Sequence, residues 1–167
     1  VYDNPLKGIL TEVITPKNKH PYSTSHLAGE KAVIQSHLSG KLQGVVLRLS
    51  NCIGAPNNKN SNCWMLLVND LCKQIIENHK MKINSNCYQL RNFITIKDVC
   101  EIVKLFTELN FRSNENTIFN VGNKTISIIN MAEIIQKRSR VILGFLPKLE
   151  TNGQDSTQVE NFEYKID

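Results

Sequence analysis

The sequence has no long apolar run and no glycine-rich phosphate loop. No apolar stretch in its 167 residues approaches the ~20 residues that a membrane-spanning helix needs, so we expect no membrane partner. The 8 glycines include no G-x-G-x-x-G set, the pattern that cradles the pyrophosphate of a dinucleotide. On its own, the chain is therefore incomplete as a dinucleotide-binding domain.

The spacing of the 5 cysteines argues against a structural metal site. The count is odd, and no two cysteines show the close spacing typical of zinc ligands, so we expect no metal. Free thiols in a reducing compartment are the simplest interpretation, and they predict a cytoplasmic location. The cysteines are Cys52, Cys63, Cys72, Cys87 and Cys100.

The excess of positive charge is small. Twenty Lys and Arg residues against 15 Asp and Glu residues give a net charge of +5, which suits an anionic ligand such as a phosphorylated metabolite. The basic residues are scattered, and aromatic residues do not alternate with them as they do on a platform for single-stranded nucleic acid. We therefore expect no nucleic-acid partner.

Alternating helical and strand patterns predict an α/β fold. Apolar residues recur at helical spacing over residues 22–38, 63–77 and 128–139, and again after Asp98, which is expected to cap the helix that follows it. Ser127 is expected to be the N-cap of the helix over 128–139. Short apolar runs at 45–50 and 117–121 are typical of buried parallel strands, and 81–84 is a further short strand. We assign residues 1–150 to one domain and residues 151–167 to a polar tail.

Tyr22 and His26 are the first candidates for chemistry. They stand four residues apart, so on a helix their side chains share one face. A cation one turn from a tyrosine favours the phenolate and lowers the pKa of the phenol towards a useful range. Taken alone, the pair is weak evidence for chemistry, because a Tyr and a His at this spacing are most often two surface or packing residues.

Four blocks in the sequence together carry a resemblance to a known family. The segment Tyr22-Ser23-Thr24-Ser25-His26 resembles the Tyr-x-x-x-Lys segment of the extended short-chain dehydrogenases/reductases, the NAD-dependent epimerase/dehydratase family. Residues 45–56 are similar to its R-x-x-N-x-x-G-P block, apart from one extra residue before the proline. Residues 91–99 resemble its R-D-F-x-x-V-x-D-V block, and residues 118–122 its F-N-V-G strand. The blocks follow in the family's order.

The resemblance implies a fold and an extent. Residues 1–150 would be the C-terminal half of a Rossmann-like doubly wound sheet, together with the smaller substrate-binding region. The glycine-rich half that holds the dinucleotide would precede Val1. The resemblance also implies an NAD(P)-dependent epimerase, dehydratase or reductase that acts on a nucleotide-sugar. Members of the family often form homodimers, so a homodimer is expected here too.

The resemblance further assigns roles by matched position. Tyr22 would be the acid/base of hydride transfer, and His26 stands where the family has lysine. Tyr22, His26 and Ser50 would contact NAD or NADP, whereas Asn51 and Arg91 would contact the diphosphate region of the nucleotide-sugar. Imidazole is shorter than lysine and mostly neutral near pH 7, so its support for Tyr22 would be weaker.

Two alternatives to an enzyme stay open. A non-catalytic relative could bind a nucleotide-sugar or a partner protein, with His26 marking lost chemistry. The chain could also be a structural piece with no function of its own. An upstream strand followed by a glycine-rich loop would favour the enzyme.

Overall fold

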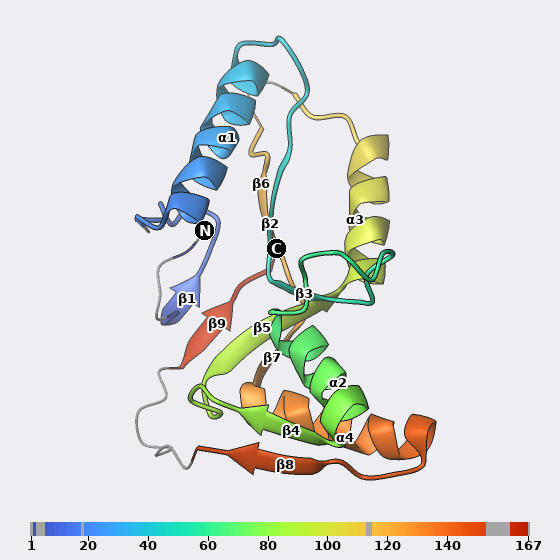
Figure 1. Ribbon diagram of the computed structural model, residues 1–167. Helices are drawn as coiled ribbons and strands as arrows, with labels where there is room; N and C mark the ends of the chain where they lie inside the picture. Colours follow the sequence, from blue (N-terminus) through green and yellow to red (C-terminus); the bar gives the residue numbers. More distant parts are fainter. Residues whose placement is uncertain (1, 3–5, 18, 113–114, 153–160, 167) are drawn as a thin grey trace. The chain divides into compact units, whose positions relative to one another are not determined.

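The computed structural model describes the chain except for residues 1, 3–5, 18, 113–114, 153–160 and 167 (Figure 1). Its helices are α1 (Pro21–Leu38), α2 (Leu67–Asn78), α3 (Ile96–Glu108) and α4 (Ile128–Leu143). Its strands are β1 (Gly8–Leu10), β2 (Val46–Leu49), β3 (Asn51–Ile53), β4 (Lys80–Ile83), β5 (Leu90–Thr95), β6 (Ile118–Val121), β7 (Lys124–Ser127), β8 (Lys148–Thr151) and β9 (Phe162–Tyr164).

The chain divides into two compact units, each built from segments that are distant in the sequence. The first unit comprises Val1–Cys52, Ile94–Asn123 and Glu160–Asp167, and the second comprises Ile53–Phe93 and Lys124–Val159. One of the points at which the chain passes between the units lies within β5, so Phe93 and Ile94 belong to different buried clusters.

The first unit is centred on a parallel pair of strands. β2 and β6 run parallel, with Val46 opposite Ile118 and Leu49 opposite Val121. Ile94, Val99 and Val121 form its buried apolar cluster. The two strands were predicted from their apolar runs, and apolar strands of this kind suit a parallel sheet covered by helices.

A second parallel pair joins the two ends of the described chain in this unit. β1 pairs with β9, so Gly8 lies opposite Phe162 and Leu10 opposite Tyr164. Tyr164 also donates a hydrogen bond from its hydroxyl group to the backbone oxygen of Arg48. β9 lies in the segment that the sequence pattern predicts as a polar tail. A strand of three residues is too short to show the alternation that would have predicted it.

The second unit packs two helices against short strands. β4 and β8 run parallel, and β5 pairs with β7 in antiparallel register, with Arg91 opposite Ile126. Its core is larger than that of the first unit. The fully or nearly buried members of this core are Leu71, Ile75, Met81, Ile83, Cys87, Phe93, Ile128, Met131, Ala132 and Ile135.

Two of the helix starts test the predicted caps. Ser127 accepts a hydrogen bond from the Asn130 backbone N–H at 3.2 Å, so the predicted cap of α4 is confirmed. The prediction for α3 was wrong, because Thr95 is the cap: its hydroxyl accepts from the Asp98 N–H at 3.1 Å. Asp98 lies in the first turn, where its negative charge still complements the helix dipole.

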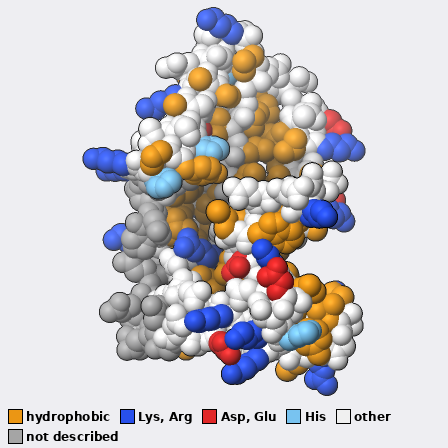
Figure 2. Space-filling view, viewed as in Figure 1, with side chains coloured by type: hydrophobic (Ala, Val, Ile, Leu, Met, Phe, Trp, Pro, Cys, Tyr) orange, Lys and Arg blue, Asp and Glu red, His pale blue; other side chains and the backbone are white. Residues whose placement is uncertain are grey.

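Lysine and arginine side chains are spread over the visible face among hydrophobic side chains (Figure 2). Within the described residues, no helix has both the length and the apolar character needed to cross a membrane.

Candidate functional site

The first turn of α1 holds Tyr22 in a defined place. Pro21 opens the helix, where its fixed backbone angle is favourable and its missing N–H is not needed. The Tyr22 N–H donates to the His20 ring nitrogen Nδ1 at 3.3 Å. Ser25 donates from its hydroxyl to the Tyr22 backbone oxygen at 2.9 Å. The backbone of Tyr22 is thereby fixed while its side chain stays 63% exposed.

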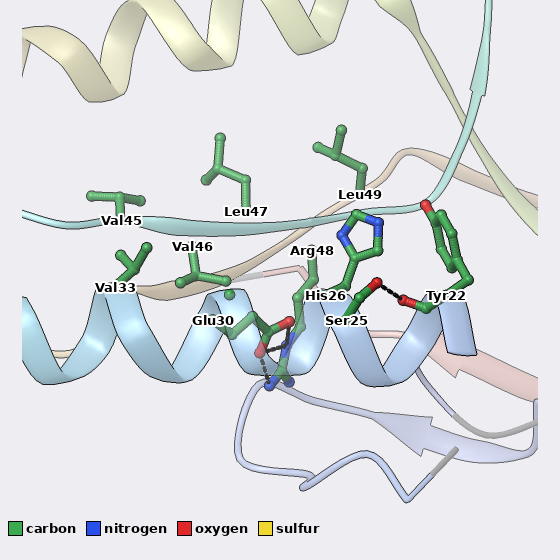
Figure 3. Close-up of a pocket in the computed structure, with 11 residues that line it drawn as sticks. Tyr22, Ser25, His26, Glu30, Val33, Val45, Val46, Leu47, Arg48 and Leu49 are labelled. Carbon is green, nitrogen blue, oxygen red and sulfur yellow. Dashed lines mark hydrogen bonds and ion pairs between the residues drawn. The ribbon is translucent and has the colours of Figure 1, made fainter. Parts of the chain in front are cut away.

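Tyr22 and His26 are in direct ring contact. Their ring centroids lie 4.3 Å apart, with the two planes tilted by 47°. Both side chains point from α1 towards the strand that carries Leu49 (Figure 3). The four-residue spacing predicted a shared helix face, and the structure shows the two rings together on it. This contact puts a phenol beside an imidazole at an exposed position.

An open groove of about 470 Å³ runs between α1 and β2 beside this pair. A Cβ atom added at Gly29 would meet nothing within 4 Å, so the glycine leaves this part of the groove unfilled. The groove is lined from α1 by Tyr22, Ser25, His26, Gly29, Glu30 and Val33, and from the strand side by residues 45–49. One helix face and one strand thus form a concave surface beside a candidate acid/base.

A buried ion pair ties the two sides of the groove together. Arg48 on β2 donates to Glu30 on α1 at 2.9 Å, and the two side chains are 6% and 11% exposed. Burial disfavours the charge of Arg48, but the hydrogen bonds to Glu30 and Tyr2 outweigh this effect and raise the pKa of the guanidinium. The ion pair fixes α1, and with it Tyr22, against β2 (Figure 3).

Further contacts of Arg48 extend this anchor, and sequence reasoning missed them. Its Nη1 atom donates to the backbone oxygens of Glu12 at 3.2 Å and Ile14 at 3.3 Å, and to the Tyr2 hydroxyl at 3.1 Å. The sequence offered one signal for part of this arrangement. Arg48 stands in one of the blocks that carry the family resemblance, and Glu30 lies four residues after another, but neither block predicts a contact between them.

Ser50 and Asn51 follow the groove along the chain without lining it. Ser50 comes directly after β2, and its hydroxyl oxygen is buried with no hydrogen-bond partner among the described residues. Asn51 opens β3 with an exposed side chain. A buried hydroxyl without a partner is uncommon and costs free energy unless something bonds to it.

Arg91 belongs to the other unit. It is half-buried, and burial lowers the pKa of its guanidinium. Its Nη2 atom donates to the side-chain oxygen of Gln89 at 3.0 Å. No carboxylate of the described residues forms an ion pair with it. The structure therefore brings Tyr22 and His26 together, while Arg91 stands on a different unit.

The described residues contain no group of three or more His, Cys, Asp or Glu side chains that could hold a metal ion.

The comparisons with known proteins decide the family. A sequence model of the NAD dependent epimerase/dehydratase family matches residues 1–122 of the chain. The chain belongs to this family. A search of the curated proteins found no match.

Solved structures agree with this NAD dependent epimerase/dehydratase assignment at the level of the fold. The chain is similar to UDP-N-acetylglucosamine 4-epimerase from Methanobrevibacter ruminantium, crystallised with UDP-N-acetylmuramic acid, with a TM-score of 0.73 and 22% identity over 94% of the chain. It is also similar to dTDP-glucose 4,6-dehydratase from Bacillus anthracis in complex with NAD, with a TM-score of 0.67 and 18% identity over 95% of the chain. A third similar structure is UDP-glucuronic acid 4-epimerase from Bacillus cereus in complex with NAD, with a TM-score of 0.67 and 22% identity over 96% of the chain.

These likenesses confirm the predicted fold class, an α/β fold of the Rossmann-like kind. The chain covers 48%, 48% and 45% of the three solved chains, so it spans about half of their length.

Proposed function

We propose that the protein is an NAD- or NADP-dependent enzyme that epimerises, dehydrates or reduces a nucleotide-sugar. The observation that carries the proposal is the ring contact of 4.3 Å between Tyr22 and His26 beside an open groove, in a chain of the epimerase/dehydratase family. The similar structures include proteins crystallised with NAD and with UDP-linked sugars, which supports this substrate class.

The residues present fit the nicotinamide end of such a cofactor. Tyr22 and His26 line an open groove, and Ser50, which follows the groove along the chain without lining it, carries a hydroxyl that lacks a partner among the described residues. The 167 residues contain no glycine-rich phosphate loop. Tyr22, His26 and Ser50 would therefore hold the nicotinamide and its ribose, and they would leave the pyrophosphate to other residues.

Tyr22 has the central role in the proposed reaction. NAD or NADP, when bound, accepts and returns the hydride. The Tyr22 phenolate takes the proton of a sugar hydroxyl as the carbon of that hydroxyl becomes a carbonyl, and the phenol returns the proton in the reverse step. His26 lies against the phenol ring and would orient it. Asn51 and Arg91 would bind the diphosphate, and a homodimer remains part of the proposal.

The test is an assay of the full-length protein with a panel of UDP-, GDP- and dTDP-sugars. We expect activity on at least one sugar and its loss in Tyr22→Phe, which keeps the ring but removes the proton donor. Tyr88→Phe is the matched control, since Tyr88 is also an exposed tyrosine, 40% exposed, and lies outside the groove. Full activity of Tyr22→Phe would contradict the mechanism.

A second candidate is a non-catalytic relative that binds a nucleotide-sugar or a partner protein, with the His26 side chain marking lost chemistry. The observation that favours it is the imidazole at the position where the family's pattern has lysine. It predicts that the natural protein and Tyr22→Phe are both inert while both bind the nucleotide-sugar equally well in a calorimetric titration.

A further inference from the structure

Arg91 is a partly buried cation whose surroundings have an unusual composition. A buried guanidinium is normally paired with a carboxylate, because an isolated charge is costly to remove from water. The hydrogen-bond partner of Arg91 is a neutral group, the side-chain oxygen of Gln89 at 3.0 Å, and no carboxylate of the described residues pairs with it. No negative charge among the described residues therefore pairs with this guanidinium, and an anionic ligand could do so.

The backbone around Gln89 is held on both sides. Its N–H donates to the Asn86 oxygen at 3.2 Å, and its oxygen accepts from the Ile128 N–H at 3.0 Å. Gln89 directly precedes β5 and Arg91 lies within that strand, and a hydrogen bond of 3.0 Å joins their side chains. A side chain that projects from a fixed backbone loses little further freedom when it positions a neighbour.

The nearby start of α4 does not offer an alternative place for an anion. The Ile128 N–H donates to the Gln89 oxygen at 3.0 Å, and the Ile129 N–H donates to the Cys87 oxygen at 2.7 Å. The Asn130 N–H is taken by the Ser127 cap. The backbone donors that make a helix N-terminus attractive to anions are thus already used. This leaves the Arg91 guanidinium as the candidate anion binder in this part of the second unit.

We propose that Gln89 is the positioning residue of an anion site at Arg91, and that its neutral amide keeps the guanidinium both oriented and fully charged for a nucleoside diphosphate. This inference rests on the proposed function and deepens it. The amide oxygen engages one N–H of a group that has five, so the other donors stay available for a forked contact with phosphate oxygens. A carboxylate at position 89 would compete for the same donors and cancel the charge.

Two substitutions separate charge from shape. Gln89→Glu keeps the size of the side chain and adds a negative charge, whereas Gln89→Met keeps the length and removes the hydrogen bond. We expect Gln89→Glu to weaken binding of UDP or dTDP to the full-length protein at least about tenfold, equivalent to ~1.4 kcal/mol. Gln89→Met should weaken it by a smaller factor, because the guanidinium keeps its charge and loses only its orientation.

Isothermal titration with each nucleotide and with its nucleoside measures the effect. The loss should appear with the diphosphate and be absent with uridine or thymidine, which carry no phosphate. Gln35→Glu is the matched control, since it adds the same charge at an exposed position on α1 and should change neither affinity. The Michaelis constant for the nucleotide-sugar should rise in Gln89→Glu while turnover at saturation stays unchanged.

The outcomes distinguish this inference from the proposed function. Arg91→Ala is the reference: if it leaves diphosphate affinity unchanged, or if the natural protein binds neither diphosphate, the anion site itself is wrong. If Arg91→Ala weakens binding but Gln89→Glu does not, or if Gln89→Met is as damaging as Gln89→Glu, the role of the neutral amide is wrong. Thermal melting of Gln89→Glu shows whether this variant is folded. If its melting is unchanged and it loses affinity equally for nucleoside and diphosphate, the role of the neutral amide is wrong.

Discussion

Position 26 holds an imidazole where the family's pattern has an ammonium group, and this difference bears directly on Tyr22. The rings of Tyr22 and His26 touch, with centroids 4.3 Å apart. A permanent positive charge so close to a phenol favours the phenolate, which is the form that takes a proton from a hydroxyl group. An imidazole in ring contact supplies orientation, but it lacks the permanent charge that a lysine ammonium group carries.

His26→Lys should therefore raise turnover in the full-length protein. We expect an increase of about tenfold at neutral pH, which corresponds to ~1.4 kcal/mol of transition-state stabilisation. Steady-state kinetics from pH 6 to 9 measures the turnover of both proteins, and we expect the largest ratio between them near neutral pH. Ala28→Lys is the control, because it adds the same charge to an exposed position of α1 outside the groove. If both variants gain equally, a general charge effect replaces the local one.

At the level of single elements, the start of α3 shows how one hydroxyl sets a helix boundary. The Thr95 hydroxyl accepts from the Asp98 N–H at 3.1 Å and satisfies a backbone donor that has no partner within the helix. The sequence pattern made Asp98 the cap because an acid at a helix start is common. The actual cap lies three residues earlier, at the last residue of β5, a strand that the sequence pattern did not predict.

Thr95→Ala should lower the free energy of unfolding by about 1 kcal/mol, the typical cost of losing an N-cap. Thr107→Ala, in the same helix, is the matched control. The Thr107 hydroxyl donates to the Lys104 backbone oxygen at 2.7 Å within the helix, and alanine is a better helix former, so no loss is expected there. Urea denaturation measures both variants. A similar loss in both would mean that the cap is not the cause.

The contact between α1 and β2 depends on the ion pair of Arg48 and Glu30. Both side chains are almost fully buried, so removing one partner leaves an uncompensated charge in the interior. Arg48→Met should lower the free energy of unfolding by roughly 3–5 kcal/mol. The double variant Arg48→Met/Glu30→Leu should recover part of this loss, because the orphaned carboxylate is gone. Thermal and urea unfolding of the three proteins tests it; no recovery in the double variant would assign the loss to the other contacts of Arg48.

Across the whole molecule, the sequence predicted what depends on local pattern. The four helices and the strands β2, β4 and β6 were predicted because apolar residues repeat at a regular spacing or form a short continuous run. The pairs β1–β9 and β5–β7 were not, because strands of three to six residues carry little pattern and their partners lie far along the chain. The division into two units also escaped prediction, since each unit joins segments separated by the other.

The candidate site divides in the same way. The contact of Tyr22 with His26 follows from a spacing of four residues on a helix, which the sequence states directly. The pairing of Arg91 with a neutral glutamine, the buried Ser50 hydroxyl and the anchor of Arg48 depend on which side chains are withdrawn from water. Burial at these positions is set by the packing of distant segments, and no local pattern encodes it.

The 167-residue chain contains the residues proposed for the nicotinamide end of the cofactor, but it has no glycine-rich loop to hold the pyrophosphate, whose contacts normally anchor a dinucleotide. Among the described residues, β2 pairs with β6 alone, so one edge of this strand is left without a ladder partner. We therefore expect the chain by itself to bind NAD weakly, while a chain extended by an upstream strand and a G-x-G-x-x-G loop binds it well. Calorimetric titration of both proteins with NAD makes the comparison, and micromolar affinity of the 167 residues alone would contradict it.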